Sequence, residues 1–567
     1  MVKLILYIIF FTGTAAIYIA TGLKYDWMKN TFSYGGYYIV FALVSLWAWT
    51  IIKTYINYRG DIRAYLKKYR KGVVISLLLT IVIFLSVTPS FRVLSDETNL
   101  LAVSKSMVYE KRVDNVTMGK WYYDSFYPIN REMQKRPLVF PFFASILHTF
   151  LGYRPENLFL LNAIALFAFF LLIYIAFKNR LGEVWAASAL LLVASQPIVI
   201  QDAASGGFDF LAALFLLIVF MALQWFLKDP TALKFQLLWV TLLMVANIRY
   251  EGIAIFAIVI LFLSFFRYIK LKFFRDGSSL AYLLTPLILA INIWPTLLEK
   301  NHFETTTEKA FSIKYLVDNS AHFLRSFLDY RFFLPYAGIV NAVGFFALLY
   351  FGWRFIFRRL PGERRDRHLI VISAVCMLVM WVLYASFYNG TVDHPTCARY
   401  YAIFCISLSV LALLLMHHLA FFRKNALYAL ALCALMLVIY HPVSVQDRFS
   451  RTQLLPREYR FVMEFLKKAD KEDKSFLVIT DRPGQYTVHN FGAVNFDLAN
   501  SDNSLYSELS NHLYEKIYVI QEILYATGKP TTGTELDSRY SLETLTESQH
   551  SDTCFTRISK VISIKEK

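Results

Sequence analysis

Charged residues are scarce in this sequence. Only 17% of the 567 residues are Asp, Glu, Lys or Arg, whereas 57% are hydrophobic. A soluble protein of this length would expose far more charge, so the composition excludes a wholly soluble chain. Long apolar runs recur from one end of the sequence to the other. This pattern indicates that lipid surrounds most of the protein.

Several familiar motifs are also missing. There are five cysteines but no CxxC pair, which excludes the common zinc and redox motifs, and we expect no disulfide between Cys397 and Cys554. The sequence has no glycine-rich nucleotide-binding loop and no internal repeat. Bases outnumber acids, with a net charge of +17. Because the bases lie in short loops between apolar segments, we predict no nucleic-acid partner.

The apolar runs are long enough to cross a bilayer, which needs about 20 residues of helix. We therefore predict an all-α polytopic membrane protein with about 13 transmembrane helices. The predicted spans are residues 2–20, 36–56, 72–91, 157–177, 184–202, 208–227, 235–247, 251–267, 280–298, 335–357, 369–388, 399–419 and 426–442. The stretch 137–151 is too short to span and is predicted to be interfacial or re-entrant.

Basic loops set the predicted orientation. They occur at 58–72, 178–180, 267–275, 354–367 and 423–424. All five fall on one side of the predicted spans, which the positive-inside rule makes cytoplasmic. The N-terminus is then cytoplasmic, and we interpret the first apolar run as a signal anchor rather than a cleaved signal peptide. The predicted outer segments are 92–136, 203–207, 299–334, 389–398 and the tail after Pro442.

Three domains are expected. Residues 1–71 hold two extra N-terminal spans and a basic loop, 72–442 form the main transmembrane domain with the large outer loop 92–136, and 443–567 form a soluble extracytoplasmic tail. The tail has dense charge and short apolar runs, which predict a small α/β domain. We expect a helix at 457–469, a buried strand at 475–480, a second helix at 507–528 and a polar, partly loose end from Lys529.

Ionisable residues beside membrane spans are costly, so they are candidates for function. Asp96 and Glu97 open the large outer loop, and Lys135 and Arg136 close it. Two ordinary roles remain open at this point. Ser95 or Asp96 can cap a helix at 97–109, and the two bases can contact lipid headgroups.

Two more charged groups lie on the predicted outer side. Asp202 and Asp209 flank a Ser-Gly-Gly turn, and we expect Asp202 to be a simple helix start. Arg249 and Glu251 occupy the tight turn of the short hairpin 235–267, where they either pair with each other or bind a ligand.

Arg399 and Tyr400 stand at the outer mouth of the span 399–419. An arginine there can extend to the interface at little cost, or it can bind a phosphate through two parallel hydrogen bonds. A transporter would place its charges near the membrane midplane in broken helices, and a channel would arrange them in rings. The charges here gather at the outer surface, which favours chemistry at the interface.

The order of these residues resembles the GT-C superfamily of integral-membrane glycosyltransferases. The similarity is greatest to its branch of protein O-mannosyltransferases and lipid A aminoarabinose transferase, and it covers roughly residues 86–419. Its local matches are KRPLVFPFFASILHTFLG at 135–152, GGFDFLAALFLL at 206–217 and ANIRYEG at 246–252. The chain departs from the family in having Arg136 in place of a proline and two spans ahead of the one that carries the Asp-Glu pair. Its tail matches no member.

The resemblance implies an inverting transfer of a sugar from a polyprenyl phosphate to an acceptor hydroxyl. Asp96 would be the general base, Glu97 would position the loop helix, and Asp209 would orient the acceptor or the sugar. The leaving phosphate would be bound by the basic residues Lys135, Arg136, Arg249 and Arg399, with Tyr400 beside the last of them. No cofactor is required, although a divalent metal on Asp96, Asp209, His148 or His394 stays open.

The implied partners are a polyprenyl-phosphate sugar, membrane lipid and a lipid, glycan or protein acceptor. The implied location is the inner or plasma membrane, with the active site and tail periplasmic or extracellular. Two other functions remain open: a polymerase or ligase of lipid-linked glycans, and a transporter or flippase of lipid-linked sugars.

Overall fold

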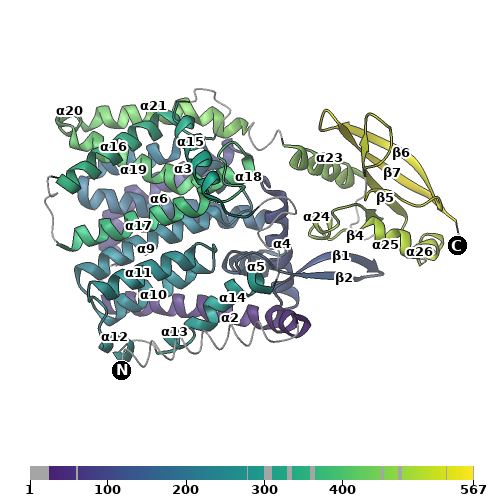
Figure 1. Ribbon diagram of the computed structural model, residues 1–567, viewed down its shortest axis with the longest axis horizontal. Helices are drawn as coiled ribbons and strands as arrows, with labels where there is room; N and C mark the ends of the chain where they lie inside the picture. Colours follow the sequence, from purple (N-terminus) through teal and green to yellow (C-terminus); the bar gives the residue numbers. More distant parts are fainter. Residues whose placement is uncertain are drawn as a thin grey trace. The chain divides into compact units, whose positions relative to one another are not determined.

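The computed structural model describes most of the chain in two compact units (Figure 1). The membrane unit comprises Met1–Ser90, Lys135–Phe143 and Leu158–Phe449, and the sheet unit comprises Phe91–Gln134, Ala144–Asn157 and Ser450–Lys567. The residues described are 25–58, 62–276, 279–298, 309–328, 335–357, 364–447, 453–469, 476–502, 504–511, 513–531 and 533–565.

The membrane unit is helical throughout its described residues. Its helices are α2 (Tyr25–Tyr58), α3 (Ile62–Ser86), α6 (Glu156–Leu181), α7 (Glu183–Ala194), α8 (Pro197–Ala203), α9 (Asp209–Lys228), α10 (Ala232–Ala246), α11 (Gly252–Phe265), α12 (Leu271–Asp276), α13 (Ser279–Leu283), α14 (Thr285–Leu298), α15 (Ile313–Ser326), α16 (Gly338–Phe357), α17 (Arg364–Ala385), α18 (Pro395–Ala398), η1 (Arg399–Tyr401), α19 (Ala402–His418), α20 (Ala420–Lys424) and α21 (Ala426–Gln446). The helix α5 (Val139–Leu151) begins in this unit.

Eight helices in the described part are long and apolar enough to cross a membrane. The helices α7 and α8, bent by 78° at their junction, make a ninth if they count as one broken span. The predicted span 2–20 lies outside the described residues, and each of the other predicted spans coincides with a helix or two consecutive helices. Because α10 and α11 are short, as expected of the hairpin 235–267, the total of thirteen spans stays a prediction.

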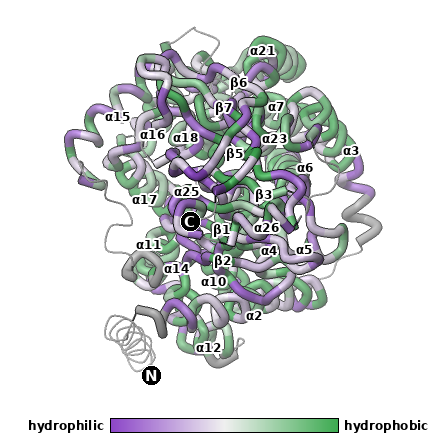
Figure 2. The backbone as a smooth tube through the Cα atoms, turned by 90° about the vertical axis from the view of Figure 1, so that its right-hand side faces the viewer, coloured by the Kyte–Doolittle hydropathy of each residue, from purple (hydrophilic) through white to green (hydrophobic). Residues whose placement is uncertain are grey.

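Polar side chains join helices inside the membrane unit. Gln236 of α10 donates to the hydroxyl of Thr50 in α2 at 3.2 Å, and Trp47 of α2 donates to Thr241 of α10 at 3.3 Å. Such bonds help helices associate where both faces are apolar. Figure 1 shows α9, α10 and α11 side by side, and α10 also packs against α2. The contacting helices α7 and α21 are mostly hydrophobic along their length (Figure 2).

The side chain of Gln196 makes three hydrogen bonds at the bend between α7 and α8. This buried side chain donates to Asn341 at 2.8 Å and to Ser409 at 3.0 Å, and it accepts from the backbone N–H of Ala337 at 3.1 Å. A buried polar side chain therefore joins the bend to α16 and α19.

The sheet unit is α/β. Its elements are α4 (Leu94–Tyr109), β1 (Asp114–Tyr122), β2 (Ser125–Met133), the C-terminal part of α5, α23 (Leu454–Ala469), β3 (Phe476–Ile479), α24 (Gly484–Thr487), β4 (Gly492–Val494), α25 (Phe496–Ser501), α26 (Ser504–Ser510), β5 (Lys516–Leu524), β6 (Tyr540–Gln549) and β7 (Cys554–Ile564). The strand order is β2-β1-β4-β3-β5-β7-β6, with β4, β3 and β5 parallel and the other pairs antiparallel.

Successive side chains along β3 point to opposite faces of the sheet, and helices cover both faces. Phe476 and Val478 pack on one face with the helix α23, whereas Leu477 and Ile479 pack on the other face with α25 and α26. All four residues are buried, as expected of a strand with both faces covered. The predicted helix at 457–469 and strand at 475–480 are therefore confirmed.

The rest of the tail differs from the prediction. The expected helix at 507–528 is wrong, because α26 ends at Ser510 and the segment Lys516–Leu524 is the strand β5. That segment is rich in Ile, Val and Tyr, which favour a buried strand. The end from Lys529, expected to be partly loose, forms β6 and β7, which pair with each other and extend from β5.

The large outer loop also groups differently from the expected division, which placed 92–136 with the transmembrane domain. The hairpin β1–β2 joins the tail's sheet through the pairing of Gly119 with Ala493. The outer loop and the tail therefore form one sheet. This pairing also covers N–H and C=O groups that an unpaired strand edge would expose.

Candidate functional site

Asp209 is the centre of a buried charged cluster in the membrane unit. It is the first residue of α9 and is only 9% exposed. The amide of Asn162 in α6 fixes the preceding turn by donating to the carbonyls of Ser205 and Gly207, both at 2.8 Å. A helix N-terminus favours a negative charge, so this carboxylate is held where the backbone stabilises it.

Arg249 binds this carboxylate from the turn between α10 and α11. Its guanidinium donates to Asp209 and, through Nε and a second nitrogen, to both oxygens of Glu251 at 3.2 Å. Gly252 makes the tight turn possible, because a Cβ there would lie 2.3 Å from the carbonyl oxygen of Val245. The sequence left open whether Arg249 pairs with Glu251; the structure shows that pair together with a second one on Asp209.

Arg399 approaches Asp209 from the opposite side of the carboxylate. It begins the short helix η1 and donates to the second oxygen of Asp209 at 3.1 Å. The neighbouring Tyr401 fixes this segment by donating to the carbonyl of Gly390 at 2.6 Å and by stacking on Phe323 at 4.9 Å. Two arginines from distant parts of the sequence therefore share one carboxylate.

Aromatic rings enclose both guanidinium groups. The Arg249 guanidinium lies 5.2–5.4 Å from the ring centres of Phe208, Tyr384 and Tyr400. Arg399 lies 5.9 Å from Phe208 and 5.4 Å from Tyr400. Cation–π contacts of this kind stabilise a desolvated charge, and the low local dielectric strengthens every pair in the cluster.

The cluster holds two positive and two negative side chains in a largely buried setting. Its carboxylates keep the guanidinium groups in place before any ligand arrives, and arginine offers planar donors that match a phosphate. Preorganised cations of this kind can stabilise negative charge that develops on a leaving group.

Lys135 and Arg136 belong to the same unit. Lys135 is exposed and Arg136 is half-buried. Just beyond them, the backbone N–H of Val139 at the start of α5 donates to the carbonyl of Asn247 at 3.1 Å. This bond joins the start of α5 to the turn that carries Arg249.

Asp202 differs from its prediction as a helix start. It lies near the end of α8, and Asp209 holds the helix start instead. The sequence did not predict roles for Phe208, Tyr384 and Asn162. Their roles depend on packing between distant helices, and the only local signal was an aromatic residue beside each candidate charge.

Asp96 and Glu97 lie in the sheet unit, in the first turn of α4, and are 5% and 1% exposed. The carboxylate of Glu97 accepts from the backbone N–H of Arg92 at 3.1 Å and of Val93 at 2.8 Å. The helix starts earlier than expected, at Leu94, so a cap by Ser95 or Asp96 is wrong, and Glu97 satisfies the helix start instead.

The two histidines considered for a metal make other bonds. His148 bonds to Ser104 at 3.1 Å and to Asn157 at 2.8 Å, and His394 bonds to Thr396 at 2.6 Å. Among the described residues, no three His, Cys, Asp or Glu side chains gather in a way that would hold a metal ion.

The similarity of this chain to known proteins is found in its structure. No family model and no curated protein matches this sequence. Two crystal structures of ArnT from Cupriavidus metallidurans match, one bound to undecaprenyl phosphate and one in the apo state. Their TM-scores are 0.53 and 0.54 at 11% and 12% identity, and each match covers 87% of this chain and 98% of ArnT. The chain has an ArnT-like fold.

This ArnT-like fold confirms the predicted fold class, a bundle of apolar helices with a small α/β domain at the C-terminus. ArnT is the lipid A aminoarabinose transferase, which belongs to the branch that the sequence resembles. With at least eight apolar helices of spanning length among the described residues, the chain is a multi-pass membrane protein.

Proposed function

We propose that this protein is an inverting glycosyltransferase that moves a sugar from a polyprenyl phosphate to an acceptor hydroxyl. The observation that carries the proposal is the pair of buried arginines, Arg249 and Arg399, held on Asp209 within an ArnT-like fold. One of the two matching ArnT structures is bound to undecaprenyl phosphate.

The two arginines would bind the donor phosphate. Breaking the bond between the sugar and its phosphate leaves negative charge on the phosphate oxygen, and two desolvated guanidinium groups absorb that charge without a proton donor. Lys135 and Arg136 would add charge from the segment joined to the Arg249 turn. Asp209 then serves to position the arginines, which refines its expected role of orienting the sugar or acceptor.

Asp96 would be the general base. A hydroxyl is a weak nucleophile, and a carboxylate poised to accept its proton accelerates attack by about 10²–10⁴-fold. The first turn of α4 is fixed by Glu97, which supports a defined position for the Asp96 carboxylate. Attack on the anomeric carbon in one step, with loss of the phosphate, inverts its configuration and needs no second carboxylate nucleophile.

The proposed site faces outwards. The basic loops of the sequence support a cytoplasmic N-terminus, which places the ends of the spans that carry Asp209, Arg249 and Arg399 on the outer side of the inner or plasma membrane. The acceptor would be a lipid, a glycan or a protein hydroxyl in that compartment.

Turnover with defined donors tests this function. Purified protein in detergent and lipid receives radiolabelled polyprenyl-phosphate sugars, with membrane extract as the acceptor. We expect release of polyprenyl phosphate and transfer of label from one donor. Arg399→Gln should lower the rate by about 10²–10³-fold, since it removes one charged donor from the leaving phosphate.

The matched control is Arg423→Gln, an exposed arginine of a basic loop, which should leave the rate unchanged. Equal rates for Arg399→Gln and the wild type would remove the arginine cluster from the mechanism. A wild type that releases no phosphate from any donor would contradict the proposed function.

A further inference from the structure

A cavity in the sheet unit lies outside the charged cluster. Its volume is about 380 Å³, within the range of about 300–1,000 Å³ typical of small-molecule sites. The lining combines aromatic residues from the end of β1 and its turn with three polar residues and a leucine from α26 and the segment after it: Trp121, Tyr122, Tyr123, Ser507, Glu508, Asn511 and Leu513.

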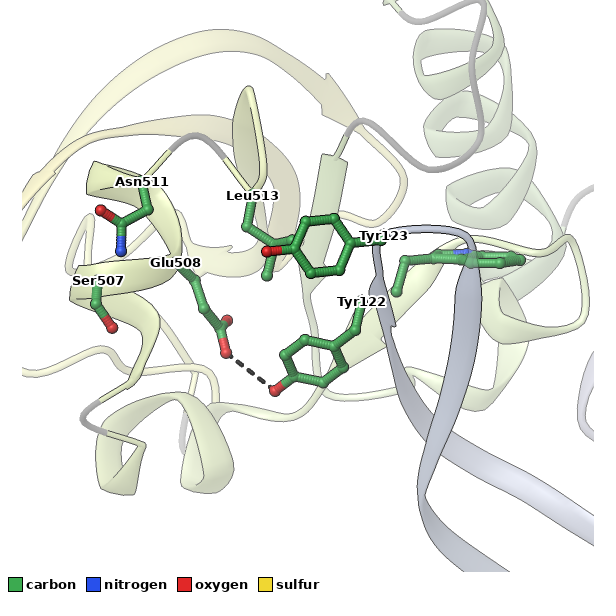
Figure 3. A pocket seen from close by; sticks show the side chains of 7 residues that line it. Tyr122, Tyr123, Ser507, Glu508, Asn511 and Leu513 are labelled. Carbon is green, nitrogen blue, oxygen red and sulfur yellow. Dashed lines mark hydrogen bonds between the residues drawn. The ribbon is translucent and has the colours of Figure 1, made fainter.

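The rings and the polar groups face each other across the cavity. Figure 3 shows Tyr122 and Tyr123 on one side, with Glu508, Ser507 and Asn511 opposite. Tyr122 is 39% exposed and Tyr123 is 87% exposed, so much of both ring surfaces is open to a ligand. Aromatic side chains that stay this exposed are not needed to fill the protein core.

Tyr123 also occupies an unfavourable backbone position. Tyr122 pairs with Ser125, so Tyr123 and Asp124 form a two-residue turn between β1 and β2. The φ angle of Tyr123 is +51°, in the left-handed region. Such turns favour Gly, Asn or Asp there, because a bulky side chain is strained. A tyrosine that is both strained and exposed does not help the hairpin to fold, which points to a role for its ring.

Glu508 is held in place on the other side of the cavity. Its carboxylate accepts from Tyr122 at 3.1 Å and from Ser504 at 2.7 Å, and it pairs with buried Lys120 at 3.0 Å. Lys120 also pairs with Asp502 at 2.6 Å. Burial, together with the charge of Glu508, raises the pKa of Tyr122 to about 12, so the phenol keeps the proton that it donates.

The charges around the cavity bear on which ligand it can hold. None of the described residues that line it is basic, and the nearby group of Lys120, Asp502 and Glu508 carries two acids for one base, which disfavours an anion. Three polar residues on one wall disfavour a lipid chain. A sugar ring has an apolar C–H face that packs on an aromatic ring, and hydroxyls that donate to a carboxylate or bond to an amide.

We propose that this cavity is a carbohydrate-binding site for a neutral or amine-bearing sugar, with Tyr122 and Tyr123 as the stacking surface and Glu508 and Asn511 as hydrogen-bonding groups. Its lining residues all belong to the sheet unit, whereas Asp209, Arg249 and Arg399 belong to the membrane unit. That the bound sugar is part of the acceptor rests on the proposed function; the binding site itself does not.

Saturation-transfer NMR on the full chain in detergent tests the site. The probes are the methyl glycosides of glucose, glucosamine and glucuronic acid. We expect saturable binding of the first two, weaker binding of the acid, and at least tenfold weaker binding after Tyr122→Ala or Tyr123→Gly. Because glycine suits the turn, Tyr123→Gly should melt no lower than the wild type, so its lost binding would not reflect unfolding.

Lys111→Gly is the matched control. Lys111 also has a positive φ, of +56°, but lies outside the cavity, so this variant relieves similar strain and should keep full sugar binding. No saturable binding of any glycoside, or unchanged binding in Tyr123→Gly, would overturn the proposal. Binding of a serine-rich peptide at these residues in place of sugars would overturn it as well.

The two proposals can fail separately. Arg399→Gln should keep its sugar binding in this assay while losing transfer. If the protein binds sugar but transfers none, the proposed carbohydrate site stands and only the proposed transferase activity is contradicted. If the protein transfers sugar but shows no binding in the NMR assay, only the proposed carbohydrate site is contradicted.

Discussion

Asp209 is the residue on which the two buried arginines converge. Its carboxylate accepts from Arg249 and Arg399, and each arginine also contacts Phe208 and Tyr400. The sequence could single out these charges because ionisable groups beside apolar spans are rare. It could not predict their pairing, since the three charged residues are up to 190 positions apart.

Removing the carboxylate should destabilise the fold. Asp209→Ala leaves two buried guanidinium groups without this partner, and breaking a buried pair costs about 3–5 kcal/mol. We expect a clear fall in the melting temperature of the purified protein. Asp318→Ala, which removes an exposed aspartate of the same unit, should melt like the wild type. Identical melting of the two variants would show that the cluster contributes nothing to stability.

Short connections between helices position the charged cluster. The α10–α11 turn carries Arg249, and the turn before α9 is fixed by Asn162. The sequence predicted both turns, because each interrupts an apolar run with glycine and polar residues. In the tail, the sequence pattern predicted α23 and β3 correctly but predicted a helix where β5 lies. An apolar run of this length fits either type of element until its neighbours in the sheet are known.

Gly252→Ala tests how far the α10–α11 turn positions Arg249. The added methyl group would lie 2.3 Å from the carbonyl oxygen of Val245, so the turn must open. We expect lower thermal stability and lower transferase activity together. Gly352→Ala is the control, because a Cβ there meets nothing within 4 Å, and alanine in a helix should be neutral or stabilising by about 0.5–1 kcal/mol. Full activity in Gly252→Ala would show that the turn tolerates the methyl group.

The helix α23 contains a carboxylate that should make stability depend on pH. Burial raises the pKa of Glu458 to about 6, although Arg482 pairs with it at 3.1 Å. The folded state then holds this proton more tightly than the unfolded state, so stability falls as pH rises through the folded pKa. The destabilisation caused by the buried Glu458 charge is fully present above about pH 6. It is lost below the pKa of Glu in the unfolded chain, about 4.3.

Glu458→Gln should remove this penalty. We expect the variant to be more stable than the wild type by about 2 kcal/mol at pH 7, with the difference shrinking towards zero near pH 4. Melting temperatures of the two proteins across this pH range measure it. A difference that stays constant with pH would contradict a raised pKa at Glu458.

At the scale of the whole molecule, composition and periodicity predicted a polytopic helical protein with an α/β tail, and the ArnT-like fold confirms that class. The sequence could not reveal that the outer loop supplies strands to the tail's sheet. The pairing of Gly119 with Ala493 joins positions more than 370 residues apart, and no local pattern specifies it. The carbohydrate-binding cavity was missed for the same reason, since its two walls come from these distant segments.

Catalysis by Asp96 is tested by one comparison of rates. Sugar transfer from the preferred polyprenyl-phosphate donor would be measured for the wild type, Asp96→Asn and Asp497→Asn, the last changing an exposed aspartate of the same unit. We expect Asp96→Asn to lose about 10²–10⁴-fold in rate while its fold and phosphate binding persist, and Asp497→Asn to stay fully active. Equal rates for all three proteins would contradict a general base at Asp96.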